Sequence, residues 1–311
     1  MPAELWTFGS DGFWRSEYSL PYSLRENLVY GTYRPDATTT GILSDRSGLT
    51  VINGNYTTVQ ASELIENKWI KGKVTIKHPG VRIKNCLITG DTAGPSSPSY
   101  SAITAYDRQT SPCVVTDCTI EASVTTVYSG NGVHGKDMEL YRCNISGWVD
   151  GIGQFDRNCV AKGNWIHDLP RYAWSPNHGD GSHNDGIQVH GGSTFTIVGN
   201  SIETGQLGTS AVIVTQDVAA TSAVLIDRNW FISVWPTQAD ATGTGLNITN
   251  TGSGGGGAAM SDITITDNEF SAFGLWKSNH AGLIDATTFD IATITGNVNV
   301  GTATAAKITR A

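Results

Sequence analysis

The residues best suited to chemistry are concentrated in residues 179–192, which read G-D-G-S-H-N-D-G-I-Q-V-H-G-G. This segment brings the carboxylates of Asp180 and Asp185 close in sequence to the imidazoles of His183 and His190. Carboxylates and imidazoles transfer protons efficiently once their surroundings move their pKa values toward the working pH. A catalytic or binding site is therefore expected here.

A second aspartate, Asp150, precedes Gly-Ile just as Asp185 does. If the two occupy equivalent positions in consecutive repeats, their carboxyl groups stand about 5 Å apart, the spacing at which one acid attacks a glycosidic carbon and the other protonates the leaving oxygen. Like charges this close also raise the pKa of one partner.

The alternative is structural, because strand alternation from Ile152 and Ile187 points both aspartates inward. An Asp before Gly can then accept backbone N–H groups in a turn.

Other side chains complete the predicted site. The catalytic residues are predicted to be Asp150, Asp185 and His183, and the substrate-binding residues Gln188, His190, His178, Gln154 and Trp174. Polar side chains on the outer surface of a β structure match sugar hydroxyl groups. Three further aromatic residues are candidates to stack on sugar rings: Trp148, Trp165 and Tyr172.

A metal site is the alternative use of the histidines. His178, His183 and His190, together with His167 and Asp180, could supply ligands. Their spacing, H-x4-H-x6-H, fits no zinc signature. No metal and no cofactor is therefore expected.

The element that must position these residues is a repeat. A short phrase such as V-R-I-K-N-C-L-I or F-T-I-V-G-N-S-I recurs eight times around a shared position, here called the anchor. The anchors are Cys86, Cys118, Cys143, Asn164, Asn200, Asn229, Asn268 and Asn297, spaced 21 to 39 residues apart. Repeats of this length indicate a solenoid. Most phrases carry apolar residues five and three positions before the anchor, and this period of two is typical of a strand.

Stacking each such strand on its equivalent predicts an all-β fold, a parallel β-helix of about eight or more coils. The anchor becomes an inward turn residue about 4.8 Å from its neighbour, so asparagines can form a ladder. Cysteine anchors are small apolar substitutes, and Cys113 and Cys159 fall on inward strand positions. All five cysteines are predicted to be buried reduced thiols, the alternative being a metal or redox role. A second strand column, upstream of the anchors, places residues 149–152 one coil from residues 184–187.

Composition is consistent with this fold and argues against several functions. Of 311 residues, 39% are apolar, 15% are charged and 36 are glycine, which indicates a folded β protein with few long helices. The net charge of −8, without a cluster of Lys or Arg, argues against a nucleic-acid partner. No run of about 18 apolar residues occurs, and the opening M-P-A-E-L-W does not resemble a signal peptide, so membrane insertion is not expected.

Two domains are predicted. Residues 1–35 carry aromatic clusters without a period and are interpreted as an N-terminal cap over the first coil or as an attachment segment. Residues 36–311 are predicted to form the β-helix. Insertions at 169–182 and 235–260 are expected to be loops that leave the coils.

Three phrases resemble the opening of a known family: T-G-I-L at 40–43, I-N-G-N at 52–55 and K-G-K-V-T-I-K-H-P-G-V-R-I-K-N-C-L-I-T-G at 71–90. They are similar to a right-handed parallel β-helix family, pectate-lyase-like, that is common in actinobacteria and their tailed phages. The resemblance spans about residues 34–270 and implies a single-stranded right-handed solenoid. Phage members are similar to minor tail or tailspike-like proteins. The first thirty residues carry no such resemblance.

The resemblance implies a phage tail protein of the virion that recognises host cell-surface polysaccharide. In the catalytic interpretation it also cleaves that polysaccharide, as a glycoside hydrolase or a polysaccharide lyase. Host cell-wall polysaccharide and other virion tail proteins would be its partners, and it would act as a homotrimer at the host cell surface. Alternatives are a non-catalytic glycan-binding or purely structural tail protein, and a secreted hydrolase or lyase.

Asn184-Asp185-Gly186 also resembles the Asn-Thr-Asp-Gly strand of polygalacturonase-like glycosidases, in which the aspartate is catalytic. Here the strand is one residue shorter, the following coil at 209–212 has no acid pair, and no Gly-His-Gly follows. The likeness therefore supports an acidic strand of that kind and not membership of that family.

Overall fold

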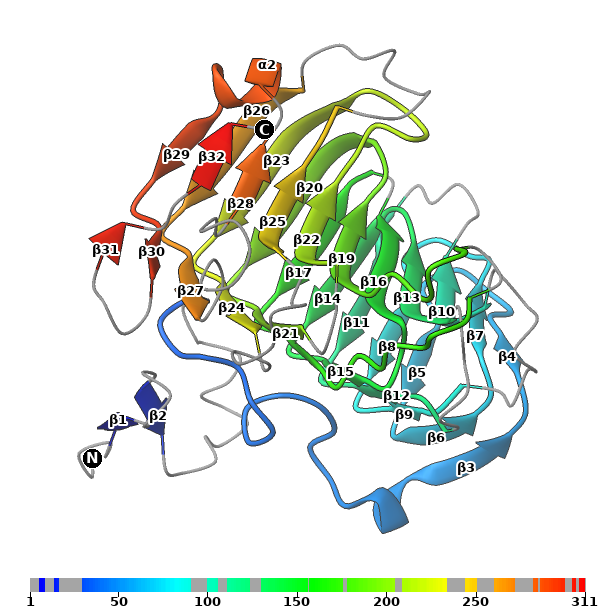
Figure 1. The fold of residues 1–311 in the computed structure, drawn as a ribbon. Helices are drawn as coiled ribbons and strands as arrows, with labels where there is room; N and C mark the ends of the chain where they lie inside the picture. The colour runs from blue at the N-terminus through cyan, green and yellow to red at the C-terminus, as the bar shows by residue number, and fades with distance from the viewer. Residues whose placement is uncertain are drawn as a thin grey trace.

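The computed structural model describes the backbone of residues 6–8, 14–16, 30–90, 100–105, 111–123, 130–155, 157–175, 178–204, 209–233, 244–250, 260–271, 282–284, 286–299, 304–305 and 308–310. Within these ranges the chain forms a stack of coils, and a full coil contributes one short strand to each of three sheets (Figure 1). The fold is an all-β, single-stranded right-handed parallel β-helix, which confirms the prediction from the repeat.

Each sheet collects equivalent strands from successive coils. The first sheet has ten strands: β4 (Tyr56–Thr57), β7 (Val74–Ile76), β10 (Tyr100–Ala105), β13 (Gly130–Gly135), β16 (Asp150–Phe155), β19 (Asp185–Val189), β22 (Ser210–Val214), β25 (Thr244–Ile248), β28 (Gly282–Ile284) and β32 (Ile308–Arg310). The second sheet has nine: β5 (Leu64–Glu66), β8 (Arg82–Lys84), β11 (Cys113–Thr116), β14 (Met138–Tyr141), β17 (Cys159–Lys162), β20 (Gly192–Val198), β23 (Thr221–Asp227), β26 (Ser261–Thr266) and β29 (Thr293–Thr295).

The third sheet follows the anchors. Its eleven strands are β3 (Thr50–Asn53), β6 (Lys68–Lys71), β9 (Leu87–Ile88), β12 (Thr119–Glu121), β15 (Asn144–Ser146), β18 (Trp165–His167), β21 (Ser201–Thr204), β24 (Trp230–Ser233), β27 (Glu269–Ser271), β30 (Val298–Asn299) and β31 (Thr304–Ala305). The sequence predicted two strand columns and not this third one, because strands of two to four residues are too short to display a period.

A few elements lie outside this scheme. They are the antiparallel pair β1 (Trp6–Phe8) and β2 (Trp14–Ser16), the 3-10 helix η1 (Arg46–Gly48), the single turn α2 (Ala286–Phe289), and the antiparallel pairing of β31 with β30. No helix among the described residues is long and apolar enough to cross a membrane.

A single apolar core runs through the coils. In the second sheet Val115 pairs with Ile83 on one side and with Leu140 on the other, and all three side chains are fully buried. Equivalent inward positions repeat this stacking along the solenoid. Burial of apolar surface between like side chains is the main stabilising contribution in such a stack.

Every anchor follows a residue in the left-handed backbone region. These residues are Asn85, Asp117, Arg142, Gly163, Gly199, Arg228, Asp267 and Gly296, with φ between 49° and 70°. The left-handed conformation costs roughly 1–2 kcal/mol for a residue other than glycine. Interactions at the turn must therefore compensate for it in the five coils where this residue is not glycine.

The asparagine anchors form the predicted ladder, which supplies that compensation at Arg228 and Asp267, the two non-glycine residues that precede an asparagine anchor. The backbone N–H and the Nδ2 of Asn200 both donate to Oδ1 of Asn229, each at 2.9 Å. Asn229 donates in the same way to Asn268, and its Nδ2 also donates to the carbonyl oxygen of Ile197. The same pattern includes the remaining asparagine anchors, Asn164 and Asn297. Each amide is thus satisfied on both sides without water.

Asn229→Ala tests the ladder. The substitution removes the acceptor for two donors of Asn200 and leaves them buried, so it should lower the free energy of unfolding by about 3 kcal/mol. A urea titration followed by circular dichroism measures the loss. The matched control is Asn247→Ala on the half-buried outward position of β25, which should change stability by less than about 1 kcal/mol. Equal losses in both variants would contradict the ladder's role.

The five cysteines are buried free thiols, as predicted. Cys86, Cys118 and Cys143 continue the anchor column, and the backbone N–H of Cys86 lies 3.4 Å from the sulfur of Cys118. The backbone N–H of Cys143 donates to Oδ1 of Asn164 at 2.8 Å, which joins the cysteine part of the column to the ladder. All eight anchors therefore form one column.

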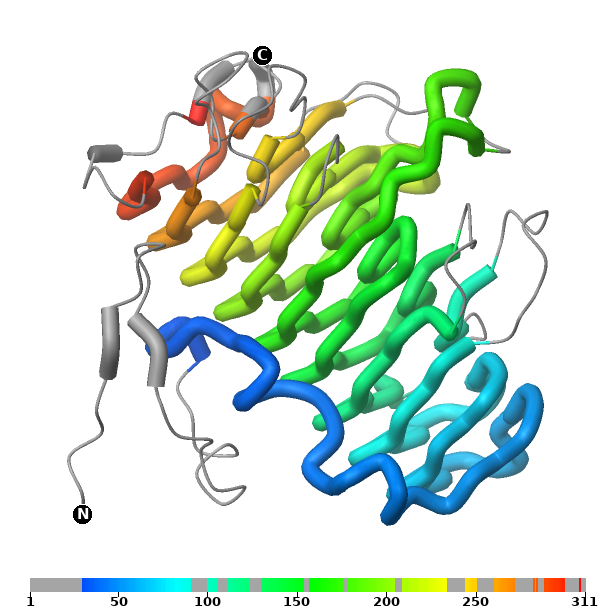
Figure 2. The backbone as a smooth tube through the Cα atoms, turned by 60° about the horizontal axis from the view of Figure 1, so that its bottom comes forward, coloured from blue at the N-terminus to red at the C-terminus, as the bar shows by residue number. Residues whose placement is uncertain are grey.

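A segment before the first coil lies along the flank of the solenoid. Residues 30–48, here called the N-terminal strap, cross the turns of several coils (Figure 2). The strap's backbone N–H groups donate to the body of the β-helix, from Gly41 to the carbonyl oxygen of Arg142 at 2.9 Å and from Leu43 to Oδ1 of Asn85 at 2.7 Å. Near its end Arg46 makes a bidentate pair with Glu121, with both contacts at 2.7 Å.

The strap bears on the predicted domain boundary. Its residues 30–35 contact the middle coils, where Arg34 reaches Ser201 and Glu203. The backbone of the predicted cap or attachment segment is otherwise described only at 6–8 and 14–16, so its role stays a prediction.

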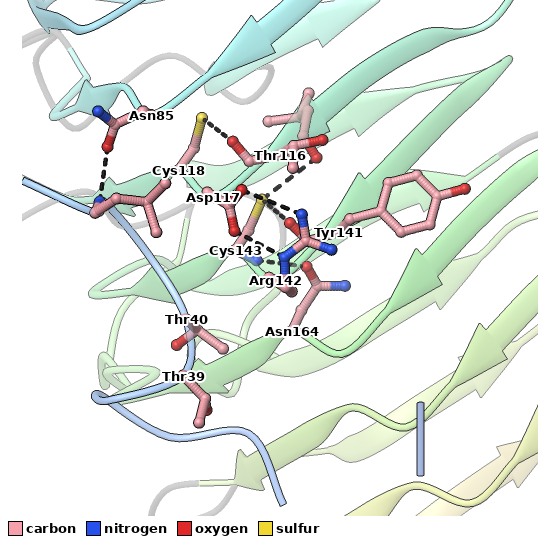
Figure 3. Close-up of polar contacts among 12 residues, drawn as sticks. Thr39, Thr40, Asn85, Thr116, Asp117, Cys118, Tyr141, Arg142, Cys143 and Asn164 are labelled. Atoms are coloured by element: carbon pink, nitrogen blue, oxygen red, sulfur yellow. Dashed lines mark hydrogen bonds and ion pairs between the residues drawn. The ribbon is translucent and has the colours of Figure 1, made fainter. Parts of the chain in front are cut away.

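A buried ion pair lies under the strap. Arg142 donates Nε to Oδ1 of Asp117 at 2.8 Å and an Nη to Oδ2 at 3.1 Å (Figure 3). Its other Nη donates to the hydroxyl of Tyr30. Both charged residues occupy the left-handed position before an anchor. Asp117 is fully buried and Arg142 nearly so. The pair therefore fixes two turns and the strap together.

Arg142→Ala should be strongly destabilising, by about 3–5 kcal/mol, because it leaves the carboxylate of Asp117 buried without its partner. The control is Arg46→Ala, which removes a surface pair with Glu121 whose side chains are 52% and 26% exposed. That change should cost no more than about 1 kcal/mol. Chemical denaturation of the two variants gives the comparison, and similar losses would show that the buried pair has no special importance.

Candidate active site

The first sheet places the two predicted aspartates in adjacent coils. Asp150 begins β16 and Asp185 begins β19. These strands are neighbours, and Ile152 pairs with Ile187, so the same register sets Asp150 beside Asp185. The vertical alignment that the sequence predicted is confirmed.

Simple alternation along the strands would point both aspartates inward. The structure does not follow that alternation. A Cβ on Gly186 would collide with Ile202 of the core, and the equivalent Gly151 is packed against the core in the same way. The side chain of Asp185 lies instead with that of Gln188, which is directed outward from β19. Glycine permits this close approach because it has no Cβ. The Asp-Gly pair is thus the point where the strand's alternation is inverted.

A continuous chain of polar contacts begins at the pair. Oδ1 of Asp150 accepts the backbone N–H of Asp185 at 2.9 Å, and Oδ2 of Asp185 accepts Nε2 of Gln188 at 2.8 Å. Oε1 of Gln188 lies 3.2 Å from Nε2 of His190, whose Nδ1 is 3.8 Å from Oδ2 of Asp217. The five side chains come from three coils and form one outward row.

The pKa values of the two carboxyl groups are raised and linked to each other. Asp185 is 2% exposed, and its Oδ1 makes no hydrogen bond among the described residues. Burial raises the pKa of Asp185 to about 6, although the amide of Gln188 and the backbone N–H of Ser210 act in the opposite direction. Burial, and then the charge of Asp185, raise the pKa of Asp150 well above its ordinary value. Because each ionised form opposes the other, the two carboxyls titrate as a unit.

A loop beside the pair holds two predicted histidines. His178 and His183 stack with ring centroids 3.9 Å apart, and Nε2 of His183 lies 3.0 Å from Oδ1 of Asp180. The base of the loop is closed by Ser182, whose N–H donates to the carbonyl oxygen of Tyr172 and whose hydroxyl accepts the N–H of Tyr172. The loop therefore carries the imidazoles next to the site, and within the described part of the chain neither donates a hydrogen bond to Asp185.

The remaining predicted residues are dispersed. Trp174 is exposed on the same loop, and Gln154 lies on β16 with a side chain outside the described part of the structure. Trp148 cannot stack on sugars, and that prediction is wrong. It is fully buried, donates Nε1 to the carbonyl oxygen of Ile120 and stacks on Tyr100.

Sequence reasoning missed Asp217, which ends the row. Oγ1 of Thr215 donates to Oδ2 of Asp217 at 2.7 Å, and both follow β22 in a turn. Burial lowers the pKa of His190, while the charge of Asp217 raises it. The sequence offered a signal, since Asp217 lies just after the strand that ends at Val214 and His190 just after the paired strand that ends at Val189.

The same column also has a structural interpretation. Asn131, Asp150, Asp185, Ser210 and Thr244 occupy equivalent positions at the start of their strands in the first sheet. Asp150 accepts the backbone N–H of the next coil, as an anchor asparagine does. The carboxylates can therefore serve as a second, shorter ladder as well as a reactive pair.

The histidines and acids do not converge elsewhere. Among the described residues, no group of three or more His, Cys, Asp or Glu side chains is arranged to hold a metal ion. His167 instead lies against other partners, with Nδ1 2.7 Å from Oδ2 of Asp168, Nε2 2.9 Å from Oδ1 of Asn144, and its ring on Trp165.

No protein-family model, curated protein or solved structure matches the chain. The class therefore rests on fold and site alone. The protein is a parallel β-helix whose first sheet carries a stacked carboxyl pair, with Asp185 buried and Asp150 half-buried.

The raised pKa of Asp185 predicts a specific pH dependence of stability. The folded state binds this proton more tightly than the unfolded state, whose aspartate has a pKa near 3.8. The contribution is therefore fully present below about pH 4 and is lost as the pH rises through about 6, a change on the order of 3 kcal/mol. Asp185→Asn cannot titrate, so its melting temperature should fall less than that of the unmodified protein between pH 4 and 7.5. The exposed Asp262→Asn is the control, and parallel pH profiles for all three proteins would refute the assignment.

Proposed function

We propose that this protein recognises a polysaccharide along the outer face of its first sheet and hydrolyses it with Asp150 and Asp185. The observation that carries the proposal is the stacked carboxyl pair, in which one buried oxygen, Oδ1 of Asp185, has no hydrogen-bond partner among the described residues. Unpaired buried polar atoms are rare in native proteins and call for a specific reason. An oxygen that reacts with a bound substrate supplies such a reason.

The pair divides into two roles. Asp150, whose pKa is raised by burial and by the charge of Asp185, is protonated and acts as the general acid. Asp185 is ionised and attacks the anomeric carbon through Oδ1, while the glycosidic C–O bond breaks and the leaving oxygen takes the proton of Asp150. Water then cleaves the glycosyl ester with Asp150 as base, so the configuration is retained, as expected for carboxyls about 5 Å apart.

Access requires movement of the loop. Asp185 is buried, so a sugar ring reaches Oδ1 only if the adjacent loop around Ser182 opens. Loop motions of this kind accompany substrate binding in many enzymes. Gln188 and His190 lie on the outward row and would bind hydroxyl groups, and the exposed Trp174 would stack on a ring.

The setting proposed is a phage tail. The resemblance of residues 34–270 to phage β-helix proteins supports a virion protein that acts at the host cell surface on cell-wall or surface polysaccharide. A homotrimer joined to other tail proteins is the corresponding assembly. Both rest on that resemblance alone, and light scattering at micromolar concentration tests the trimer directly, since a 33.1 kDa species would refute it.

The second candidate function is glycan binding without cleavage. Its specific support is the bond from the backbone N–H of Asp185 to Asp150, because a carboxylate held in this way also completes a structural ladder. Under this alternative the outward row still binds sugar, and the aspartates only stabilise the coils.

Asp185→Asn distinguishes the two functions. If Asp185 is the nucleophile, the variant should keep its melting temperature within a few degrees and keep glycan binding, and lose cleavage of host cell-wall polysaccharide by about 10² or more. Reducing-end release measures cleavage, absorbance near 235 nm detects unsaturated lyase products, and Asp262→Asn is the control. No cleavage by the unmodified protein, or equal cleavage by Asp185→Asn, would leave the non-catalytic function.

A further inference from the structure

A cavity lies between the N-terminal strap and the third sheet, away from the aspartates. Its volume is about 230 Å³, and its walls are formed by Arg34, Asp36, Ala37, Thr38, Trp165 and Glu203. Four of these residues belong to the strap, and the other two come from β18 and β21. The cavity thus exists only because the strap is docked on the coils.

The aromatic wall is held in one orientation. Nε1 of Trp165 donates to Oε1 of Glu203 at 2.9 Å, and the indole stacks on His167 with centroids 3.5 Å apart and planes 15° from parallel. His167 is itself fixed, since Nε2 lies 2.9 Å from Oδ1 of Asn144. A side chain restrained on two sides loses little conformational entropy when a ligand binds. The indole is therefore preorganised.

The polar walls are fixed in the same manner. Arg34 donates an Nη to Oε1 of Glu203 at 3.1 Å and Nε to the hydroxyl of Ser201 at 3.3 Å. Oδ1 of Asp36 accepts the N–H and the hydroxyl of Thr38, at 2.8 and 2.7 Å. Among the described residues, no hydrogen bond involves Oδ2 of Asp36 or Oε2 of Glu203. Two carboxylate oxygens on opposite sides of the cavity are thus placed to accept hydrogen bonds.

We propose that this cavity binds a single neutral pyranose ring, as a site separate from the carboxyl pair. A sugar ring has an apolar face suited to the indole of Trp165 and equatorial hydroxyl groups that donate to carboxylates such as those of Asp36 and Glu203. The proposal does not depend on catalysis at Asp185.

Size and charge define the ligand. Pockets for drug-sized molecules have volumes of about 300–1,000 Å³, so a cavity of about 230 Å³ holds one ring and not an oligosaccharide. Its two carboxylates outnumber its one guanidinium, and that guanidinium is paired with Glu203. Anionic ligands such as uronates and phosphates are therefore disfavoured, and the hydrogen-bond acceptors favour an uncharged polyol ring.

The test is titration with monosaccharides, followed by ligand-observed saturation-transfer NMR and by calorimetry. The probes are glucose, galactose, mannose, N-acetylglucosamine and, as the anionic comparison, glucuronate. At least one neutral sugar should bind with a millimolar Kd, and glucuronate should bind at least ten-fold more weakly. Asp185→Asn should bind the same sugar with unchanged Kd, which separates this site from the proposed function.

Two variants locate the binding. Ala37→Trp fills the cavity from an exposed position on the strap and should raise the Kd at least ten-fold without lowering the melting temperature. The second variant, Trp165→Ala, should raise the Kd to the same extent. Two controls accompany these variants: Trp165→Phe should retain binding, and so should Trp174→Ala, which lies in the loop beside the carboxyl pair. The proposal is overturned if no neutral sugar binds, if glucuronate binds best, or if Ala37→Trp binds as well as the unmodified protein.

Discussion

The structure depends on one repeated interaction, the stacking of an anchor on its equivalent in the next coil. Each anchor follows a left-handed residue, a conformation that is unfavourable for the arginines and aspartates found there. Asn229 and Asn268, which follow Arg228 and Asp267, offset this cost, because each amide donates to the next coil and to a strand carbonyl of the coil before. The turns are therefore identical enough for the strands on either side to stay in register. Everything that the protein places on its surface is positioned by that register.

The carboxyl pair shows how a regular scaffold produces an irregular site. Gly151 and Gly186 interrupt the alternation of their strands and direct the preceding aspartates outward. The register then stacks the two acids one coil apart, where burial raises both pKa values and the charge of Asp185 raises that of Asp150 further. Two glycines in equivalent positions thus change the direction of the residues before them within an otherwise regular sheet.

The sequence predicts the parts of this protein that repeat. The anchors, the inward positions and the alignment of Asp150 with Asp185 follow from periodicity, because stacking forces equivalent residues together. The outward direction of the aspartates did not follow, since alternation was assumed to continue through Gly186. Trp148 was misassigned because an aromatic residue beside a strand has the same signature whether it is buried or exposed. Contacts between the strap and distant coils, such as Arg34 with Glu203, have no local signal at all.

The strap also has a consequence for the order of assembly. A solenoid can form progressively, since each coil needs only its neighbour. The strap precedes the coils in the chain, yet Gly31 packs against Arg228 and Arg34 pairs with Glu203, which are synthesised some two hundred residues later. The start of the strap is synthesised early, but it can dock only after most of the coils have formed. Docking of residues 30–35 would therefore indicate that the solenoid is complete to that point, because a chain truncated before Asn200 would lack Ser201 and Glu203, to which Arg34 donates.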